Sequence, residues 1–322
     1  MPHGQMKISL ITPAGKRSKS GNRTTAGRWA RILRTLGHKV HVEEVYGGAD
    51  ADMMVALHAW RSADSMNVFR ASFPGRPLVV ALTGTDIYKF QHSHPEVTLD
   101  SMRQADWLVC LHDGVAQDIP AEFGRKLSVI PQSSPPLTRA RAPAQRHFDI
   151  CVIGHLREEK DSLRAAYAAR NVSPESKLRV IHLGKAHDES WAREAEAEMA
   201  RNERYIWRGE VPGWKVRREF VKTRLMVISS IMEGGANVVS EALVAGVPII
   251  ASDISGNIGM LGEDYPGLYS TSDTAALQAL LEKAETDSAF LDDLTRRCKA
   301  LAPRYTFENE TACWQAALGK IT

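Results

Sequence analysis

Short apolar runs alternate with helical patterns along the chain, and the alternation occurs twice, once on each side of a Pro-, Ser- and Arg-rich segment at Pro131–Arg146. Alternating strands and helices are typical of parallel sheets covered by helices, so we expect an α/β protein with two Rossmann-like domains. The strands predicted for the first half are Lys7–Thr12, Val40–Val45, Met53–Leu57, Leu78–Leu82, Trp107–Leu111 and Leu127–Ile130. Those predicted for the second half are Phe148–Ile153, Leu178–Leu183, Tyr205–Trp207, Leu225–Ser229, Pro248–Ala251 and Leu268–Tyr269.

The length of the chain agrees with this division, because 322 residues exceed what one hydrophobic core usually supports. We expect an N-terminal domain at residues 1–145 and a C-terminal domain at residues 146–302, joined by the Pro-rich segment. The last helical pattern is Phe307–Leu318, within the final segment 303–322.

Composition indicates a globular protein, with 43% apolar and 25% charged residues. No apolar run is long enough to span a bilayer, and the stretch before Ile8 is too short and polar for a signal peptide. The cysteines are widely spaced and fit neither a zinc site nor a disulfide framework, so we expect a protein of the reducing cytoplasm. They are Cys110, Cys151, Cys298 and Cys313.

The most informative motif begins at Glu233, in the loop after the predicted strand Leu225–Ser229. Loops at the carboxyl ends of strands bind ligands in open α/β sheets. Gly234 and Gly235 come next and allow the backbone to approach a ligand closely. The alternative interpretation is a helix start that carries only capping and surface carboxylates.

The residues after these glycines are predicted to begin a helix. The N–H groups of Ala236, Asn237 and Val238 lie at its start and suit a phosphate. Glu241 follows Glu233 by about two turns, on a helix whose other residues are mostly apolar. A carboxylate there is costly to bury unless it accepts hydrogen bonds, and ribose hydroxyls are suitable donors.

A cationic loop follows the first predicted strand and leads directly into a helix. Positive charge and hydroxyls at a helix start favour a small, highly charged anion over a neutral sugar. The alternatives are a solvated basic face and docking on an acidic membrane, although the helix lacks the exposed apolar wedge that docking requires. The residues concerned are Lys16, Arg17, Lys19, Gly21, Asn22, Arg23 and Thr24.

Two further loops of the first half follow strands, and they should lie at the same edge of the sheet. His58 comes directly after Met53–Leu57, and it is either a hydrogen-bonded loop histidine or a group close to the reacting atoms. Thr85 and Asp86 come after Leu78–Leu82. Asp86 is either a helix N-cap or, with Thr85, a contact to an acceptor.

The spacing of Glu233 and Glu241 resembles the E-x7-E motif of glycosyltransferases with the GT-B fold, especially glycosyltransferase family 4. The resemblance implies two Rossmann-like domains with a cleft between them and a final helix, within 303–322, that crosses back to the first domain. It also implies a UDP-sugar donor, with Glu233 against the sugar and Glu241 on the ribose hydroxyls. The loop that contains Gly209 and Val211 is where the family cups the nucleobase.

A second segment is similar to the family's diphosphate-binding sequence G-R-L-x-x-x-K-G. Lys160 matches the Lys, whereas His155 occupies the position of the Arg. Arg157, two residues further on, is the other residue that could supply a cation. Such groups would be catalytic, because negative charge builds on the diphosphate as the bond to the sugar breaks.

Several segments together resemble a narrower group, the selenosugar synthases of selenoneine biosynthesis. They are Ile11–Pro13, Gly21–Thr25, His58–Ser62, Thr83–Asp86, Gly154–Arg157 and Gly256–Gly262. This resemblance implies transfer of N-acetylglucosamine or glucose from a UDP-sugar to selenophosphate, with formation of a C–Se bond and release of UDP. On this interpretation His155 is a feature of the group. The alternatives are an ordinary family 4 transferase with a hydroxyl acceptor and a nucleotide-sugar-binding module without turnover.

This interpretation also predicts the partners of the chain. A selenium nucleophile needs little help with deprotonation, so no dedicated general base is expected. No acidic cluster has metal-ligand spacing, so we expect transfer without a metal or a cofactor. The basic stretch lacks interleaved aromatic residues, which argues against nucleic-acid binding, and we expect no stable membrane association. The sequence does not fix the oligomeric state, and a homo-oligomer is one of the alternatives.

Overall fold

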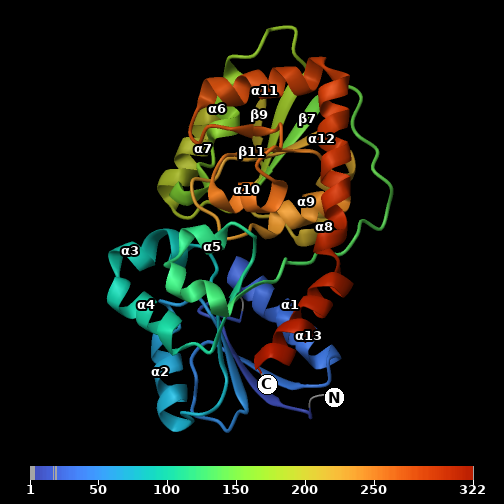
Figure 1. The fold of residues 1–322 in the computed structure, drawn as a ribbon. Helices are drawn as coiled ribbons and strands as arrows, with labels where there is room; N and C mark the ends of the chain where they lie inside the picture. Colours follow the sequence, from blue (N-terminus) through green and yellow to red (C-terminus); the bar gives the residue numbers. More distant parts are fainter. Residues whose placement is uncertain (1–3, 17, 19, 322) are drawn as a thin grey trace. The chain divides into compact units, whose positions relative to one another are not determined.

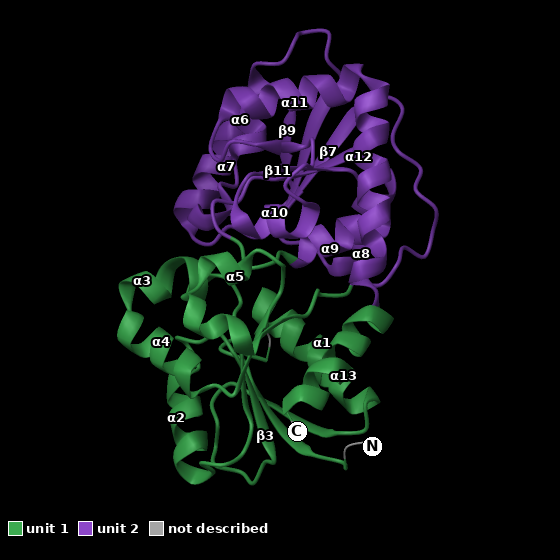
Figure 2. Cartoon of the chain, in the orientation of Figure 1, with its two compact units in different colours: residues 1–133, 233–236, 307–322 green, residues 134–232, 237–306 purple. Residues whose placement is uncertain are grey.

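The computed structural model describes residues 4–16, 18 and 20–321. The chain divides into two compact units, shown in two colours in Figure 2. Unit 1 comprises residues 1–133, 233–236 and 307–322, and unit 2 comprises residues 134–232 and 237–306. The chain therefore leaves unit 1 before residue 145, where we expected the boundary, and the short segment 233–236 packs with unit 1.

Unit 1 contains a six-stranded parallel sheet in the order β2-β1-β3-β4-β5-β6. Its strands are β1 (Lys7–Ile11), β2 (Lys39–Glu43), β3 (Met53–Leu57), β4 (Leu78–Ala81), β5 (Trp107–Cys110) and β6 (Leu127–Val129). Its helices are α1 (Gly21–Thr35), α2 (Ala63–Ser72), η1 (Asp86–Phe90), α3 (Gln91–Ser93), α4 (Pro95–Gln104), α5 (Val115–Asp118), η2 (Ala121–Lys126) and α13 (Phe307–Ile321).

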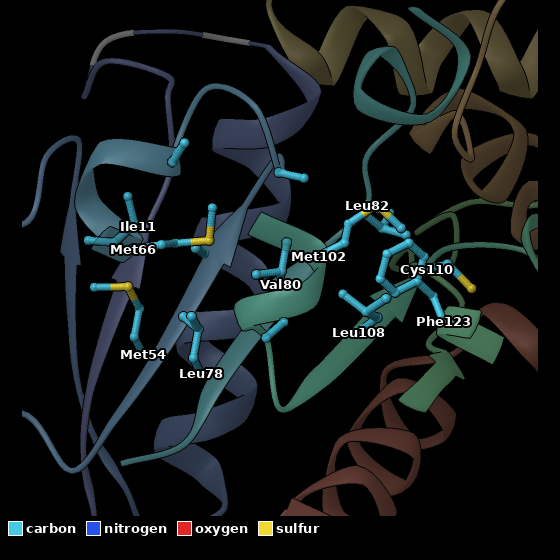
Figure 3. Close-up of a cluster of buried hydrophobic side chains, with 14 of the residues drawn as sticks. Ile11, Met54, Met66, Leu78, Val80, Leu82, Met102, Leu108, Cys110 and Phe123 are labelled. Atoms are coloured by element: carbon cyan, nitrogen blue, oxygen red, sulfur yellow. The ribbon is translucent and has the colours of Figure 1, made fainter. Parts of the chain in front are cut away.

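The core of unit 1 lies on both faces of this sheet. One cluster joins the sheet to α2, α4 and α5, and Figure 3 shows Met54, Met66 and Val80 within it. The other joins the sheet to α1 and α13, which lie side by side in Figure 1. The indole rings of Trp29 and Trp314 meet edge to face there, with centroids 4.9 Å apart. The last helix thus belongs to the hydrophobic core of unit 1.

Unit 2 contains a second six-stranded parallel sheet in the order β12-β11-β10-β7-β8-β9. Its strands are β7 (Phe148–Ile153), β8 (Leu178–Leu183), β9 (Tyr205–Trp207), β10 (Leu225–Ile228), β11 (Ile249–Ser252) and β12 (Leu268–Tyr269). Its helices are η3 (Glu158–Lys160), α6 (Arg164–Arg170), α7 (Glu189–Arg201), α8 (Gly213–Lys222), α9 (Asn237–Ala245), α10 (Ser255–Leu261), α11 (Thr274–Thr286), α12 (Ser288–Leu301) and η4 (Ala302–Tyr305).

The α/β class and the parallel sheets predicted from the sequence are confirmed, because each predicted strand is present within one residue or two of its expected ends. The segment Pro131–Arg146 contains neither helix nor strand. Part of it is attached to unit 2 by Arg141, whose guanidinium donates to the carbonyl oxygens of Thr223 and Gly246, both at 2.6 Å. The four cysteines are free thiols. Among the described residues, no helix is long and apolar enough to cross a membrane.

Candidate active site

The Glu233 loop packs against the loop after β4 within unit 1. A Cβ atom added to Gly84 would lie 2.7 Å from the backbone nitrogen of Gly234, and one added to Gly234 would lie 2.5 Å from the carbonyl carbon of Thr83. A Cβ on Gly235 would lie 2.6 Å from that of Leu111. Gly84 and Gly235 also have φ angles of 125° and 113°, which L side chains rarely adopt. Glycine is therefore required where these loops touch.

His58 lies at the carboxyl end of β3 and is 1% exposed. Its Nδ1 accepts a hydrogen bond from the backbone N–H of Arg61 at 3.2 Å, so the neutral ring carries its proton on Nε2. Nε2 lies 2.8 Å from the hydroxyl of Thr85 and donates to it. Burial lowers the pKa of His58, and Arg61 adds to this effect while Asp86 opposes it. A φ of 76° is uncommon outside glycine and holds the residue in a strained conformation.

Asp86 holds the loops after β3 and β4 together. Its side chain is fully buried, and its carboxylate accepts hydrogen bonds from the backbone N–H groups of Ala59, Thr83, Gly84 and Ile87 at 2.8–3.2 Å. These bonds tie the loop after β4 to the loop after β3. Asp86 therefore positions these loops, and it lies within η1, after the N-cap position at Thr85. The predicted contact of Asp86 to an acceptor stays a prediction.

The cationic loop before α1 is described in part, because Arg17 and Lys19 lie outside the described residues. The backbone N–H of Lys16 donates to Glu44 at 3.0 Å, and the side chain of Lys16 is exposed. The helix α1 begins at Gly21 with Asn22, Arg23 and Thr24 in its first turn.

Three polar atoms at this loop are buried and make no hydrogen bond to the part of the chain that the structure describes. They are Thr12 Oγ1, Ser20 Oγ and Arg23 Nη1. Ser20 occupies the N-cap position of α1, yet its side chain makes no capping hydrogen bond. Buried polar atoms are rarely left without partners, and Ser20 and Arg23 lie at the amino end of α1, the positive end of the helix dipole.

In unit 2, a hollow of about 270 Å³, which includes open solvent, lies at the carboxyl ends of β7, β8 and β10. Its polar lining consists of Gly154, His155, Lys160, Ser162, His182, Ser229 and Ser230. The hydroxyl of Ser229 donates to the backbone carbonyls of Lys160 and Asp161 at 3.2 and 2.9 Å and so holds the loop that carries Lys160. The structure thus brings His155 and Lys160 together at one hollow.

His155 is fixed as a neutral N–H donor. The backbone N–H of Lys185 donates to its Nδ1 at 3.1 Å, which leaves the proton on Nε2. Burial lowers its pKa, and the cations Arg157, Lys160 and Lys185 lower it further, while Glu210 opposes them. Arg157 itself does not line the hollow; its side chain is 45% exposed, with Nε 3.8 Å from a carboxylate oxygen of Glu159.

His182 supports this loop and was not predicted from the sequence. It is fully buried on β8, where Nε2 donates to the carbonyl oxygen of Gly154 at 3.2 Å and Nδ1 accepts from the hydroxyl of Tyr205 at 2.9 Å. Burial lowers the pKa of His182 to about 4. The apolar run Leu178–Leu183 could have indicated it, because a histidine in such a run needs buried partners.

The other residues predicted for the donor side lie at the start of α9, along α9 and in the loop after β9. Helix α9 begins at Asn237, after Ala236, with Val238 in its first turn, and Glu241 is half-buried further along it. Gly209 follows β9 with a φ of 63°, and its carbonyl accepts a hydrogen bond from the N–H of Gly184 at 2.9 Å. Val211, two residues on, is half-buried. Among the described residues, no group of His, Cys, Asp and Glu side chains could hold a metal ion.

Two parallel sheets in two units, each with its functional loops at the carboxyl ends of the strands, define the α/β fold of the GT-B glycosyltransferases. Residues 137–302, more than half of the chain, match the family model described as "Glycosyl transferases group 1". The chain therefore belongs to this family of glycosyltransferases.

Solved structures support the fold over nearly the whole chain. HepE from Anabaena, in complex with UDP and glucose, is 14% identical with a TM-score of 0.79, covering 98% of this chain and 100% of that one. Sucrose-phosphate synthase from Thermosynechococcus elongatus is 12% identical with a TM-score of 0.76, covering 98% and 99%. A glycosyltransferase from Rickettsia africae is 10% identical with a TM-score of 0.75, covering 99% of both chains. A search of the curated proteins finds no matching relative.

Proposed function

We propose that this glycosyltransferase transfers N-acetylglucosamine or glucose from a UDP-sugar to selenophosphate. Selenium attacks the anomeric carbon, the bond from that carbon to the β-phosphate oxygen breaks, and its electron pair leaves with UDP. Water then hydrolyses the P–Se bond and yields phosphate and a 1-selenosugar. The observation that carries the choice of acceptor is the group of three buried, unpartnered polar atoms at Thr12, Ser20 and Arg23.

On the donor side, the hollow of unit 2 supplies a cation and a neutral donor for the diphosphate, Lys160 and the Nε2–H of His155. These groups would stabilise the charge that develops on departing UDP. Glu241 on α9 would accept from the ribose hydroxyls, the first turn of α9 would face a phosphate, and the loop Gly209–Val211 would contact the base. The UDP-bound fold relatives are consistent with a UDP donor.

On the acceptor side, Lys16 and Arg23 would offset the repulsion between selenophosphate and the donor diphosphate, together with Arg17 and Lys19. Glu233 would lie against the donor sugar, next to the loop that carries Thr85. His58 would act through Thr85, because its Nε2–H already donates to that hydroxyl. The transfer would need no general base, since selenium is a soft nucleophile.

The test measures UDP release from UDP-N-acetylglucosamine and UDP-glucose, with selenophosphate, thiophosphate, a panel of sugar and alcohol acceptors, or no acceptor. We expect release that depends on selenophosphate. Release that depends only on a hydroxyl acceptor would identify an ordinary family 4 transferase. Binding of the UDP-sugar without any release would identify a nucleotide-sugar-binding module.

Two variants refine the assignment of the acceptor. Arg23→Ala should raise the KM for selenophosphate about tenfold or more, the value of a lost charge-assisted hydrogen bond, without changing the affinity for UDP. Lys39→Ala is the matched control, because Lys39 is an exposed cation at the amino end of β2. Equal KM values in wild type and Arg23→Ala would remove the anionic acceptor from the proposal.

A further inference from the structure

A buried charged network in unit 1 takes no part in the functions assigned above. Glu310 on α13 is fully buried, and its carboxylate pairs with the Nε of Arg28 on α1 at 2.9–3.0 Å. It also accepts hydrogen bonds from Trp29 Nε1 at 2.8 Å and from the backbone N–H and hydroxyl of Ser133. A buried carboxylate is tolerated only with such complete pairing, so the network has a defined geometry.

Gln132 extends this network towards the Glu233 loop. Its Oε1 accepts from Arg28 Nη2 at 2.7 Å and from the hydroxyl of Thr25 at 3.0 Å. Because a guanidinium only donates, the atom facing Arg28 must be the carbonyl oxygen, and the amide cannot be turned over. Its Nε2 therefore donates in the other direction, to the backbone carbonyl of Gly235 at 3.2 Å.

Gly235 lies two residues after Glu233, in a loop that already touches Gly84 and Leu111 at its backbone. The hydrogen bond from Gln132 to its carbonyl fixes the orientation of the peptide that follows Gly235. We propose that Gln132, oriented by Arg28 and Glu310, is a positioning residue for glycosyl transfer that holds the loop of Glu233 in place. The assignment rests on the proposed role of Glu233 at the donor sugar.

The hydrogen-bond network joins three segments that lie far apart in the sequence. Helix α13 contributes Glu310 to unit 1, α1 contributes Arg28, and the end of the first sheet contributes Gln132. Segments from both ends of the sequence are thereby linked, through Arg28 and Gln132, to the carbonyl of Gly235. If the network served only to join α1 and α13, the Arg28–Glu310 pair and the hydrogen bond from Trp29 to Glu310 would be sufficient. The hydrogen bond from the Gln132 amide to Gly235 would then not be needed.

The test compares Gln132→Glu, Gln132→Met and Gln91→Met. Gln132→Glu keeps acceptors for Arg28 and Thr25 but loses the donor to Gly235. Gln91 is the matched control, because it is a buried glutamine of the same unit whose Nε2 donates to the backbone carbonyl of Asp118 at 2.7 Å. The readouts are kcat and KM with whichever acceptor releases UDP, the melting temperature, and hydrogen exchange of the amides at 234–236.

We expect both Gln132 variants to lower kcat and to speed exchange at 234–236 by about fivefold or more, the value of one hydrogen bond. Acceptor KM should stay unchanged, and Gln91→Met should change only the melting temperature. Unchanged exchange and kcat in Gln132→Glu would overturn the proposal, as would equal effects of Gln91→Met. Exchange needs no turnover, so this result is separate from the outcome of the UDP-release assay.

Discussion

Gly84 and Gly234 meet backbone to backbone, because a Cβ on Gly84 would lie 2.7 Å from the nitrogen of Gly234. This contact places the Glu233 loop beside the residue that precedes Thr85, whose hydroxyl accepts from His58. Three residues that were predicted for the site and lie in different loops are thus brought to one edge of the sheet of unit 1. They are His58, Thr85 and Gly234. The buried carboxylate of Asp86 holds the loops after β3 and β4 together, because it accepts hydrogen bonds from the backbone N–H groups of Ala59 and Gly84.

Gly234→Ala tests whether this contact matters for transfer. Its Cβ cannot be accommodated without moving one of the loops, and overpacking of this kind costs about 1–3 kcal/mol. We expect kcat to fall about tenfold or more, with the UDP affinity little changed. Gly27→Ala is the control, because Gly27 lies within α1 and a Cβ there meets no atom within 4 Å. Wild-type kcat in Gly234→Ala would show that the loops need not touch.

Three variants distinguish the roles of His155 and Arg157. His155 lines the hollow beside Lys160 and presents a fixed Nε2–H, whereas Arg157 is exposed near Glu159. His155→Phe should therefore lower kcat/KM for the UDP-sugar about tenfold or more, since it removes the N–H donor that we propose for the leaving group.

Arg157→Ala should lower the same kcat/KM by no more than about twofold, the effect of an exposed charge. His155→Gln, which keeps a neutral N–H donor, should restore part of the activity lost in His155→Phe. A larger loss in Arg157→Ala than in His155→Phe would assign the diphosphate contact to Arg157 instead.

The strands were predictable because their apolar runs are short, buried and separated by clear helical patterns. The start of α9 at Asn237 was predictable for the same local reason, since Gly234 and Gly235 mark the turn before it. Local pattern also placed His58 and Thr85 at strand ends, because parallel strands share one carboxyl edge.

The supporting residues were not predictable, because their roles arise from contacts across the fold. Glu310 looks like an ordinary polar residue in a helix, and only the packing of α13 on α1 places it beside Arg28. Gln132 lies in a coil segment that was interpreted as a linker, yet its amide joins residues 25, 28 and 235. The burial of Asp86 and its four backbone partners were likewise not predictable, because they depend on how the loops after β3 and β4 pack together.

The lowered pKa of His182 makes the stability of the protein depend on pH. Its pKa is about 4 in the folded protein, compared with 6.5 for a solvated histidine, because burial disfavours the charged ring. The unfolded chain therefore binds more protons between about pH 6.5 and pH 4, and the free energy of unfolding falls as the pH falls through this window. The contribution of His182 should fall by about 2 kcal/mol between about pH 7 and pH 5.

His182→Gln removes this titration and retains an amide that can donate to Gly154 and accept from Tyr205. Its free energy of unfolding, measured in urea at both pH values, should decline about 2 kcal/mol less than that of wild type. The difference between the two proteins is the relevant quantity, because burial also lowers the pKa of His58, His112 and His155 and these groups act in the same direction. Parallel declines in wild type and variant would mean that His182 titrates alike in the folded and unfolded chains, and that its ring is not held neutral beneath the loop of Gly154.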